Sequence, residues 1–352
     1  MCADTTVVKH TAWTGRMVWD GRELQQTDDW SIELNITEIN ELRKFVNASL
    51  SSNKPLAEQS FCDYDLAKLS MRLLSLREEI LDGRGFTLIR GLSKTDWTDA
   101  ELTRAYWIIG SVFGNPVSQN AHADLLGHVT DLRISDNSVV RTYQTNAAQA
   151  FHSDSCDIVA LLCLRPAKRG GGSAIASSAS IHNQLLDKNP QALQTLYSEF
   201  ICDRYGEIPE GKKPFYPVHV FNAVAGKLVC CGMDPDIRSA PRLDDVDELS
   251  DLQVSALDAF QQAAKKSALN MMLERGDIQL VNNLTVVHAR ESFEDHVDLD
   301  KRRYLLRLWL SSPLGRQLPE FLNERWGSIA VGSLRGGIRV PGVRPQVNFA
   351  PC

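Results

Sequence analysis

The longest strongly apolar run in this chain is only as long as a β-strand, which limits what the chain can fold into. Residues 158–164 (IVALLCL) form that run, and Pro166 follows it closely. A membrane-spanning helix needs about 20 mostly apolar residues, so the sequence predicts no membrane association. A short aliphatic run bounded by proline is instead typical of a buried strand. We therefore expect a protein built around a β-sheet.

Composition and charge exclude several other classes of protein. The 352 residues are 43% hydrophobic and 23% charged, as in ordinary globular proteins. A formal net charge of −6 argues against a nucleic-acid binder, which needs a basic surface to neutralise phosphates. Eight cysteines with no CxxC pair, and no signal-like start, favour a cytoplasmic protein. The expected partner is a small-molecule substrate; the sequence leaves open whether the chain forms a homo-oligomer.

Helical and strand patterns follow one another in an order typical of an α+β protein. We expect helices at residues 35–50, 66–81, 100–113, 181–187, 190–200 and 250–272. We expect strands at residues 86–90, 139–151, 158–164, 174–177 and 303–311, another running from 276 toward His288, and a hairpin over 218–231. Strands on both sides of a helical insertion, after a helical cap, predict a β-barrel or jelly roll with flanking helices.

No linker or repeat divides the chain, so the sequence predicts a single domain over residues 1–352. Within it we expect four parts, listed here in chain order: a mostly helical cap over 1–115, a jelly-roll core over 116–312, an insertion in that core over about 180–275, and a C-terminal extension over 313–352.

Three His-x-Asp triplets, at 122–124, 152–154 and 296–298, are candidates for part of a metal site. About this many are expected by chance, so their context has to separate them. The first follows a proline-containing loop, and the last lies among acidic residues typical of a solvated loop. His152 and Asp154 instead lie between two predicted strands. Alternate residues of a strand point to the same face, so these two side chains can reach one metal ion.

A second histidine and two arginines complete the pattern. His288 follows an apolar stretch, and two histidines with one carboxylate leave open positions on an octahedral iron. Arg303 and Arg307 share one face of the last predicted strand. Two arginines that point into a barrel are costly unless they meet anions.

Three segments together resemble the taurine dioxygenase/TfdA-like group of iron(II)- and 2-oxoglutarate-dependent oxygenases. They are FHSDSCDIVALLCLRPAKRGGGS, NNLTVVHAR and RRYLLRLWL, in the order and separation of that family, within a similarity over roughly residues 80 to 312. The resemblance implies a distorted double-stranded β-helix that holds iron(II) through His152, Asp154 and His288. It also implies oxidation of an unactivated C–H bond, by hydroxylation, desaturation or ring closure, with 2-oxoglutarate and O2 as cosubstrates.

The resemblance assigns further residues to the two small molecules. Arg303 takes the position of the arginine that binds the distal carboxylate of 2-oxoglutarate, and Ser173, after Gly171-Gly172, takes that of a hydroxyl that assists it. Arg307 takes the position of a substrate-anion anchor. Asn146, on the strand that enters His152, is a candidate pocket residue. These positions favour a small, amino-acid-like carboxylate as the substrate.

For several of these residues a purely structural role is the alternative. Ser173 could be a polar turn residue, Arg307 could bridge acids at the barrel rim, and Asn146 could face solvent. Arg302 is a rival to Arg303, one residue away and on the opposite strand face. At the level of function, the alternatives are a zinc-dependent hydrolase that uses the same three ligands and a non-catalytic β-barrel binding protein.

Overall fold

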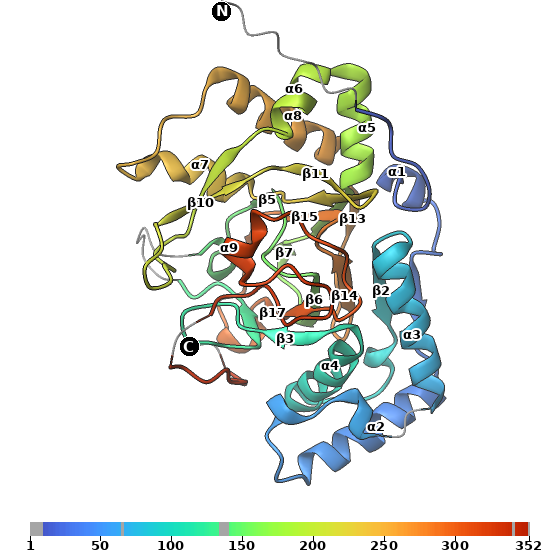
Figure 1. Ribbon diagram of the computed structural model, residues 1–352. Helices are drawn as coiled ribbons and strands as arrows, with labels where there is room; N and C mark the ends of the chain where they lie inside the picture. Colours follow the sequence, from blue (N-terminus) through green and yellow to red (C-terminus); the bar gives the residue numbers. More distant parts are fainter. Residues whose placement is uncertain (1–9, 65–66, 134–140, 340–341, 351–352) are drawn as a thin grey trace, which may run out of the picture.

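Two β-sheets pack face to face at the centre of the molecule (Figure 1). The structure is a computed structural model that describes residues 10–64, 67–133, 141–339 and 342–350. The larger sheet has the strand order β1-β2-β14-β6-β17-β3, with β4 also paired to β17, and the smaller has the order β13-β8-β15-β5. The strands of the larger sheet are β1 (Ser31–Glu33), β2 (Phe86–Arg90), β3 (Asn115–Val117), β4 (Gly127–Val129), β6 (Ile158–Arg165), β14 (Ile278–Asn282) and β17 (Tyr304–Ser311).

The smaller sheet carries both histidines of the predicted metal site. Its strands are β5 (Gln149–His152), β8 (Ser173–Ser177), β13 (Leu269–Met271) and β15 (Val286–Arg290). Val286 and Ile175 of this sheet pack against Val159 and Leu305 of the larger one, so a shared apolar core fills the space between the sheets. The α+β jelly-roll prediction is confirmed.

Helices cover the outer faces of both sheets (Figure 1). α2 (Ile36–Leu50), α3 (Ala67–Asp82) and α4 (Asp99–Phe113) form a core cluster with the outward face of the larger sheet. α5 (Ser178–Lys188), α6 (Pro190–Leu196) and α8 (Asp251–Lys266) do the same on the smaller sheet. The remaining elements are α1 (Gly21–Leu24), α7 (Asp234–Ser239), α9 (Leu322–Trp326), β7 (Arg169–Gly170), β9 (Phe200–Asp203), β10 (Phe215–Val218), β11 (Phe221–Val224), β12 (Lys227–Cys230) and β16 (Phe293–Glu294).

Local capping explains why several helices begin where the sequence predicts. The Asn35 side chain accepts from the backbone N–H of Glu38, and the Glu38 carboxylate accepts in return from the backbone N–H of Asn35. Ser250 and Gln253 form the same reciprocal pair at the start of α8. Each pair satisfies backbone N–H groups that the first turn of a helix leaves without partners.

Two predicted helices are too long because short strands replace their ends. The helix expected over 250–272 ends at Lys266, and β13 then pairs with β8. The helix expected over 190–200 ends at Leu196, and β9 pairs with β10. In both cases pairing with another strand, the distant β8 for β13 and the nearby β10 for β9, outweighs the local helical pattern.

The strand predicted from residue 276 toward His288 is in fact two strands that lie in different sheets. β14 ends at Asn282, and β15 begins at Val286. Asn282 favours the turn because its side chain donates to Ile80 O and accepts from the backbone N–H of Leu284.

The strand predicted over 139–151 is also shorter than expected, since β5 begins only at Gln149. Residues 139 and 140, like residue 66 of the second predicted helix, lie outside the described residues.

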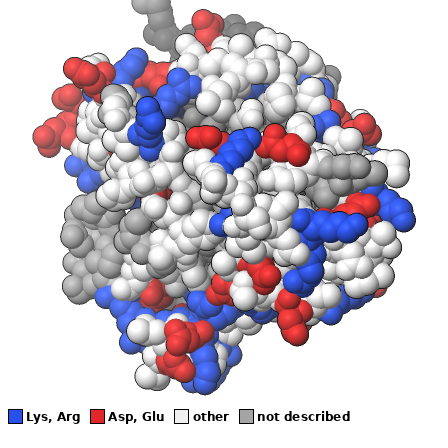
Figure 2. Space-filling view, turned by 90° about the horizontal axis from the view of Figure 1, so that it is seen from below, with Lys and Arg blue, Asp and Glu red and all other residues white. Residues whose placement is uncertain are grey.

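No helix in the described ranges is long and apolar enough to cross a membrane. Acidic and basic side chains are interspersed on the face shown in Figure 2.

Candidate metal centre and active site

The three predicted metal ligands meet at one end of the smaller sheet. His152 and His288 lie directly opposite each other across the β5–β15 pair, with ring centroids 4.2 Å apart. Asp154 follows β5 by two residues; its carboxylate oxygens lie 3.9 Å from His152 Nε2 and 3.6 Å from His288 Nε2. One ligand atom from each residue falls within 4.8 Å of the others. This spacing suits a single metal ion held by two imidazoles and a carboxylate.

Hydrogen bonds orient His152 as a metal ligand. Its Nδ1 donates to Ala150 O at 2.9 Å, which leaves the lone pair on Nε2. The amide nitrogen of Gln149 lies 2.9 Å from the same Nε2. A metal ion would bind the same lone pair of His152 Nε2 that Gln149 contacts. Gln149 must therefore release Nε2 when a metal binds.

Asn283, in the turn before β15, fixes the segment that carries Asp154. Its side-chain oxygen accepts from the backbone N–H of Asp154 at 2.9 Å, and its side-chain nitrogen donates to the carbonyls of Asp154 and Cys156. Trp309 Nε1 donates to Asp154 Oδ2 at 2.9 Å. The turn between the two sheets therefore positions the carboxylate relative to both histidines.

The charge states of His152 and Asp154 fit a divalent metal. Burial, and then the neighbouring His288, lowers the pKa of His152 to about 4, so its imidazole is neutral at pH 7. Burial alone would raise the pKa of Asp154, but the positive charge of Arg307 and the hydrogen bond from His288 hold it well below its usual range. Neutral imidazoles and an ionised carboxylate are the forms that bind metal ions.

A cavity of about 200 Å³ opens beside His152 and Asp154. Polar and aromatic side chains dominate its lining, including Gln119, Arg141, Tyr143, Glu207, Asp236, Arg307, Trp309 and Arg325. Arg307 donates from Nε to Gln119 Oε1 at 2.8 Å, and its Nη1 lies 3.5 Å from Asp154 Oδ2. Its guanidinium lies 4.8 Å from the ring centroids of both Tyr143 and Trp309. Arg307 thus faces the cavity next to the metal ligands.

Arg303 is buried inside the barrel with an unsatisfied guanidinium. Its Nη1 is buried and has no hydrogen-bond partner among the described residues, and burial lowers its pKa to about 10. Gly171, at a φ of +74°, lies so close that an added Cβ would stand 3.1 Å from Arg303 Nε. Ser173 lies opposite Arg290 in the β8–β15 register. A buried arginine that forms no ion pair with a described residue, beside a backbone conformation that favours glycine, fits a site for a carboxylate.

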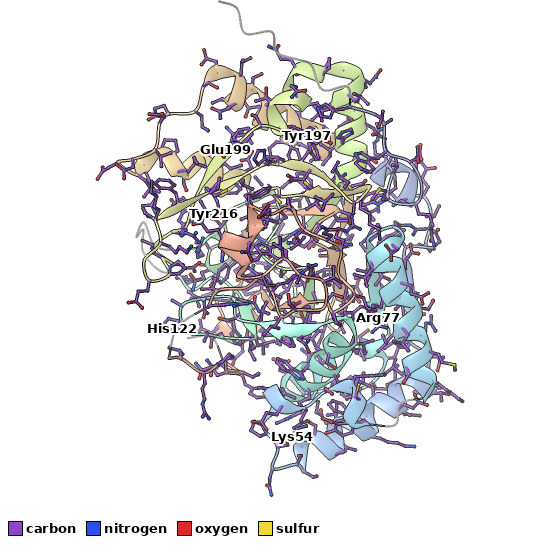
Figure 3. All side chains as sticks on the ribbon, viewed as in Figure 1. Lys54, Arg77, His122, Tyr197, Glu199 and Tyr216 are labelled. Carbon is purple, nitrogen blue, oxygen red and sulfur yellow. The ribbon has the colours of Figure 1, made fainter. Side chains whose placement is uncertain are left out.

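The structure separates the rival candidates from this site. Arg302 is half-buried and donates from Nε to His296 O, so it points away from the barrel interior. Asn146 is exposed and does not line the cavity. His122 is also exposed and lies far from the smaller sheet in Figure 3, while Asp124 accepts from Asn348 at 2.5 Å.

Several cavity residues had no signal in the sequence. Arg141 and Tyr143 come from the segment before β5, Asp236 from α7, and Arg325 from α9. They are distant in the sequence and meet only through tertiary packing, and none belongs to a recognisable short motif.

Comparison with known proteins agrees with this geometry. The family model described as "Taurine catabolism dioxygenase TauD, TfdA family" matches residues 52–309, well over half of the chain. The chain belongs to the TauD, TfdA family. It is therefore a non-haem iron, 2-oxoglutarate-dependent oxygenase, and its His152, Asp154 and His288 lie close enough together to hold one metal ion.

Two curated members of similar length resemble this chain along most of its sequence. FR-33289 synthase from Streptomyces rubellomurinus is 31% identical over 328 residues, which cover 89% of this chain and 95% of that protein. The taurine hydroxylase-like protein SAT17 from Stachybotrys chartarum is 30% identical over 321 residues, which cover 88% of this chain and 82% of that protein.

Solved structures share the fold at low sequence identity. An asparagine oxygenase in complex with Fe(II), 3-hydroxyasparagine and succinate has a TM-score of 0.59 at 14% identity, over 80% of this chain and 93% of its own. The non-haem iron oxygenase OrfP with Fe and α-ketoglutaric acid has a TM-score of 0.58 at 16% identity, over 86% and 99%.

Proposed function

We propose that this TauD, TfdA-family oxygenase oxidises an unactivated C–H bond of a small, amino-acid-like carboxylate. The observation that carries the proposal is that the three candidate metal ligands lie together, and that two of them, His152 and Asp154, line a cavity that is also lined by arginines. Bound iron(II) and 2-oxoglutarate supply the oxidising power, by activating O2. The protein contributes binding, orientation and a site shaped for the substrate.

We assign the distal carboxylate of 2-oxoglutarate to Arg303, assisted by Ser173. The unsatisfied Nη1 of Arg303 supports this assignment, because a buried guanidinium without a counter-anion is costly. Arg290 adds a second buried guanidinium within electrostatic range of Arg303. Its Nη2 donates to the carbonyls of Thr142 and Thr145, and so ties the segment before β5 to β15.

Arg307 is our candidate anchor for the substrate carboxylate. It lines the cavity, and its contacts to Gln119 and Asp154 use only Nε and Nη1. A guanidinium has five N–H donors, so others are free to meet a carboxylate. Relatives of similar fold that are recorded with hydroxylated asparagine or arginine support an amino-acid-like substrate.

A reducing compartment such as the cytoplasm fits this proposal. The six cysteines in the described part of the chain are all free thiols, and five of them are buried.

The proposal is tested by O2 uptake and succinate release from the iron(II)-loaded protein. We expect a panel of amino acids and other small carboxylic acids to contain a compound that stimulates both, in proportion to an oxidised product. Metal analysis accompanies the assay. Stoichiometric zinc together with no 2-oxoglutarate-dependent O2 uptake would favour the hydrolase instead.

A further inference from the structure

The C-terminal segment beyond the family match forms part of the cavity wall. Arg325 of α9 and Ile338 both line the cavity, although the match ends at residue 309. α9 lies beside Tyr216 in Figure 3, and the guanidinium of Arg325 stands 5.9 Å from the Tyr216 ring. Residues beyond the family match therefore contribute to the wall of the site.

This segment is docked firmly next to the metal ligands. Arg335 is fully buried and pairs with the buried Asp157 at 2.6 Å. The backbone N–H of Gly337 donates to Ser155 O at 2.7 Å, one residue after Asp154. The carbonyl of Gly337 accepts from Arg325 Nη1 at 3.1 Å. The position of Arg325 is thus set through backbone contacts that also reach the metal-binding segment.

The other two arginines of the cavity each have a carboxylate partner, but Arg325 has none among the described residues. Arg141 pairs with Glu207 at 2.8 Å, and Arg307 lies 3.5 Å from Asp154. Within the described ranges, Arg325 has no carboxylate within 4.0 Å, and the adjacent Glu324 pairs with Arg204.

The carboxyl group of the cavity that lies within electrostatic range of Arg325 does not cancel this charge. Asp236 also lines the cavity, within electrostatic range of Arg325 and Arg141, but it forms no ion pair with a described residue. Burial raises the pKa of Asp236 to about 7, so its carboxyl group is partly protonated at neutral pH. A protonated carboxyl group can donate a hydrogen bond to an anion.

We infer that Arg325 is a specificity-determining residue that binds a second anionic group of the substrate, apart from the carboxylate held at Arg307. The planar guanidinium favours an oxyanion, which can be a carboxylate or a phosphate-type group. The substrate class is then a small metabolite with two anionic groups. The inference rests on the proposed function and narrows it.

Binding to the full-length, iron(II)-loaded protein with 2-oxoglutarate under anaerobic conditions tests this inference. The probes are matched pairs: L-glutamate with L-glutamine, L-aspartate with L-asparagine, and O-phospho-L-serine with L-serine. We expect the acidic member of at least one pair to bind at least about tenfold more tightly. The pair that shows the preference identifies whether the second anion is a carboxylate or a phosphate.

Arg325→Gln should remove that preference, because glutamine can still donate to Gly337 O but carries no charge. Arg339→Gln is the matched control. Arg339 belongs to the same segment and donates to Leu334 O, but it is exposed and does not line the cavity. The control should keep the preference of the wild type.

Three results would overturn the inference: equal affinity for both members of every pair, no binding of any acidic probe, or an unchanged preference in Arg325→Gln. The complex with 2-oxoglutarate is followed separately by its visible absorption, without any substrate. Loss of that absorption would count against the proposed function, whereas its retention with a failed preference would count against Arg325 alone.

Discussion

We propose His152, Asp154 and His288 as the three protein ligands of the iron, so any one substitution should abolish iron binding. We expect His152→Ala, Asp154→Ala and His288→Ala to lose stoichiometric iron(II) and 2-oxoglutarate turnover, as measured by metal analysis and succinate release. His122→Ala and His296→Ala should retain both. Loss of iron in the His122 variant, with retention in the His152 variant, would show that the wrong His-x-Asp triplet was chosen.

Arg303 should decide the affinity for 2-oxoglutarate. Losing a charge-assisted pair inside the barrel costs roughly 1.5–3 kcal/mol, so Arg303→Ala should raise the apparent 2-oxoglutarate constant about tenfold or more. Arg302→Ala is the control, since Arg302 donates to His296 O and points away from the barrel interior. An unchanged apparent 2-oxoglutarate constant in the Arg303 variant would show that another arginine binds 2-oxoglutarate.

Asp236 should lower the stability of the fold at neutral pH. Its pKa is raised from the usual value near 3.8 to about 7. Between these values the folded state holds a proton that the unfolded state has lost, so the free energy of unfolding falls as pH rises from about 4 to 7. Asp236→Asn should therefore be more stable than the wild type at pH 8, by roughly 1–3 kcal/mol, and similar at pH 4.

Urea unfolding of both proteins at the two pH values checks this prediction. Arg141 and Arg325 attract the charged form of Asp236, while Asp154 and Asp203 repel it, and all four are present in both proteins. The difference between variant and wild type therefore isolates Asp236. A variant that is less stable at pH 8 would mean that the carboxylate supports the fold rather than the site.

At the scale of elements, the sequence predicts what local chemistry decides. The reciprocal caps at Asn35 and Ser250 identify the starts of α2 and α8, and the aliphatic run identifies β6. β9 and β13 could not be predicted in this way, because each is a short strand that forms by pairing with another strand, β9 with the nearby β10 and β13 with the distant β8. The alternation of buried Leu269, exposed Asn270 and buried Met271 was the one local signal of β13.

Gly337, which packs the C-terminal segment against the core, allows a test at the scale of elements. Gly337 has a φ of +70°, and an added Cβ would stand 2.7 Å from Ser118 O and 2.9 Å from Val117 Cβ. Gly337→Ala should therefore cost about 1–3 kcal/mol in the free energy of unfolding. By displacing the segment that holds Arg325, it should also raise the substrate KM.

Gly332→Ala is the matched control for that variant. Gly332 has a φ of +84°, but the nearest atom to its added Cβ is Pro313 O at 3.8 Å. Gly332→Ala should therefore lower the free energy of unfolding only by the cost of placing alanine in a left-handed backbone conformation. Equal losses of stability and equal KM values in the two variants, measured by urea unfolding and initial rates, would show that close packing at Gly337 does not position the site.

At the scale of the whole molecule, the metal centre was predictable and the substrate cavity was not. His152, Asp154 and His288 belong to segments whose order and separation resemble those of the TauD, TfdA family. Arg141, Asp236 and Arg325 come from three separate parts of the chain, and only the folded arrangement brings them to one cavity. The same arrangement assigns a role to the C-terminal segment, which the sequence alone left without one.

Anaerobic absorption spectroscopy tests the central claim most directly. Iron(II) held by His152, Asp154 and His288 should bind 2-oxoglutarate and give a weak visible charge-transfer band, with one equivalent of iron per chain. The band should be absent in His288→Ala and should need more 2-oxoglutarate in Arg303→Ala. A wild-type protein that binds iron(II) stoichiometrically but gives no band at saturating 2-oxoglutarate would contradict the account.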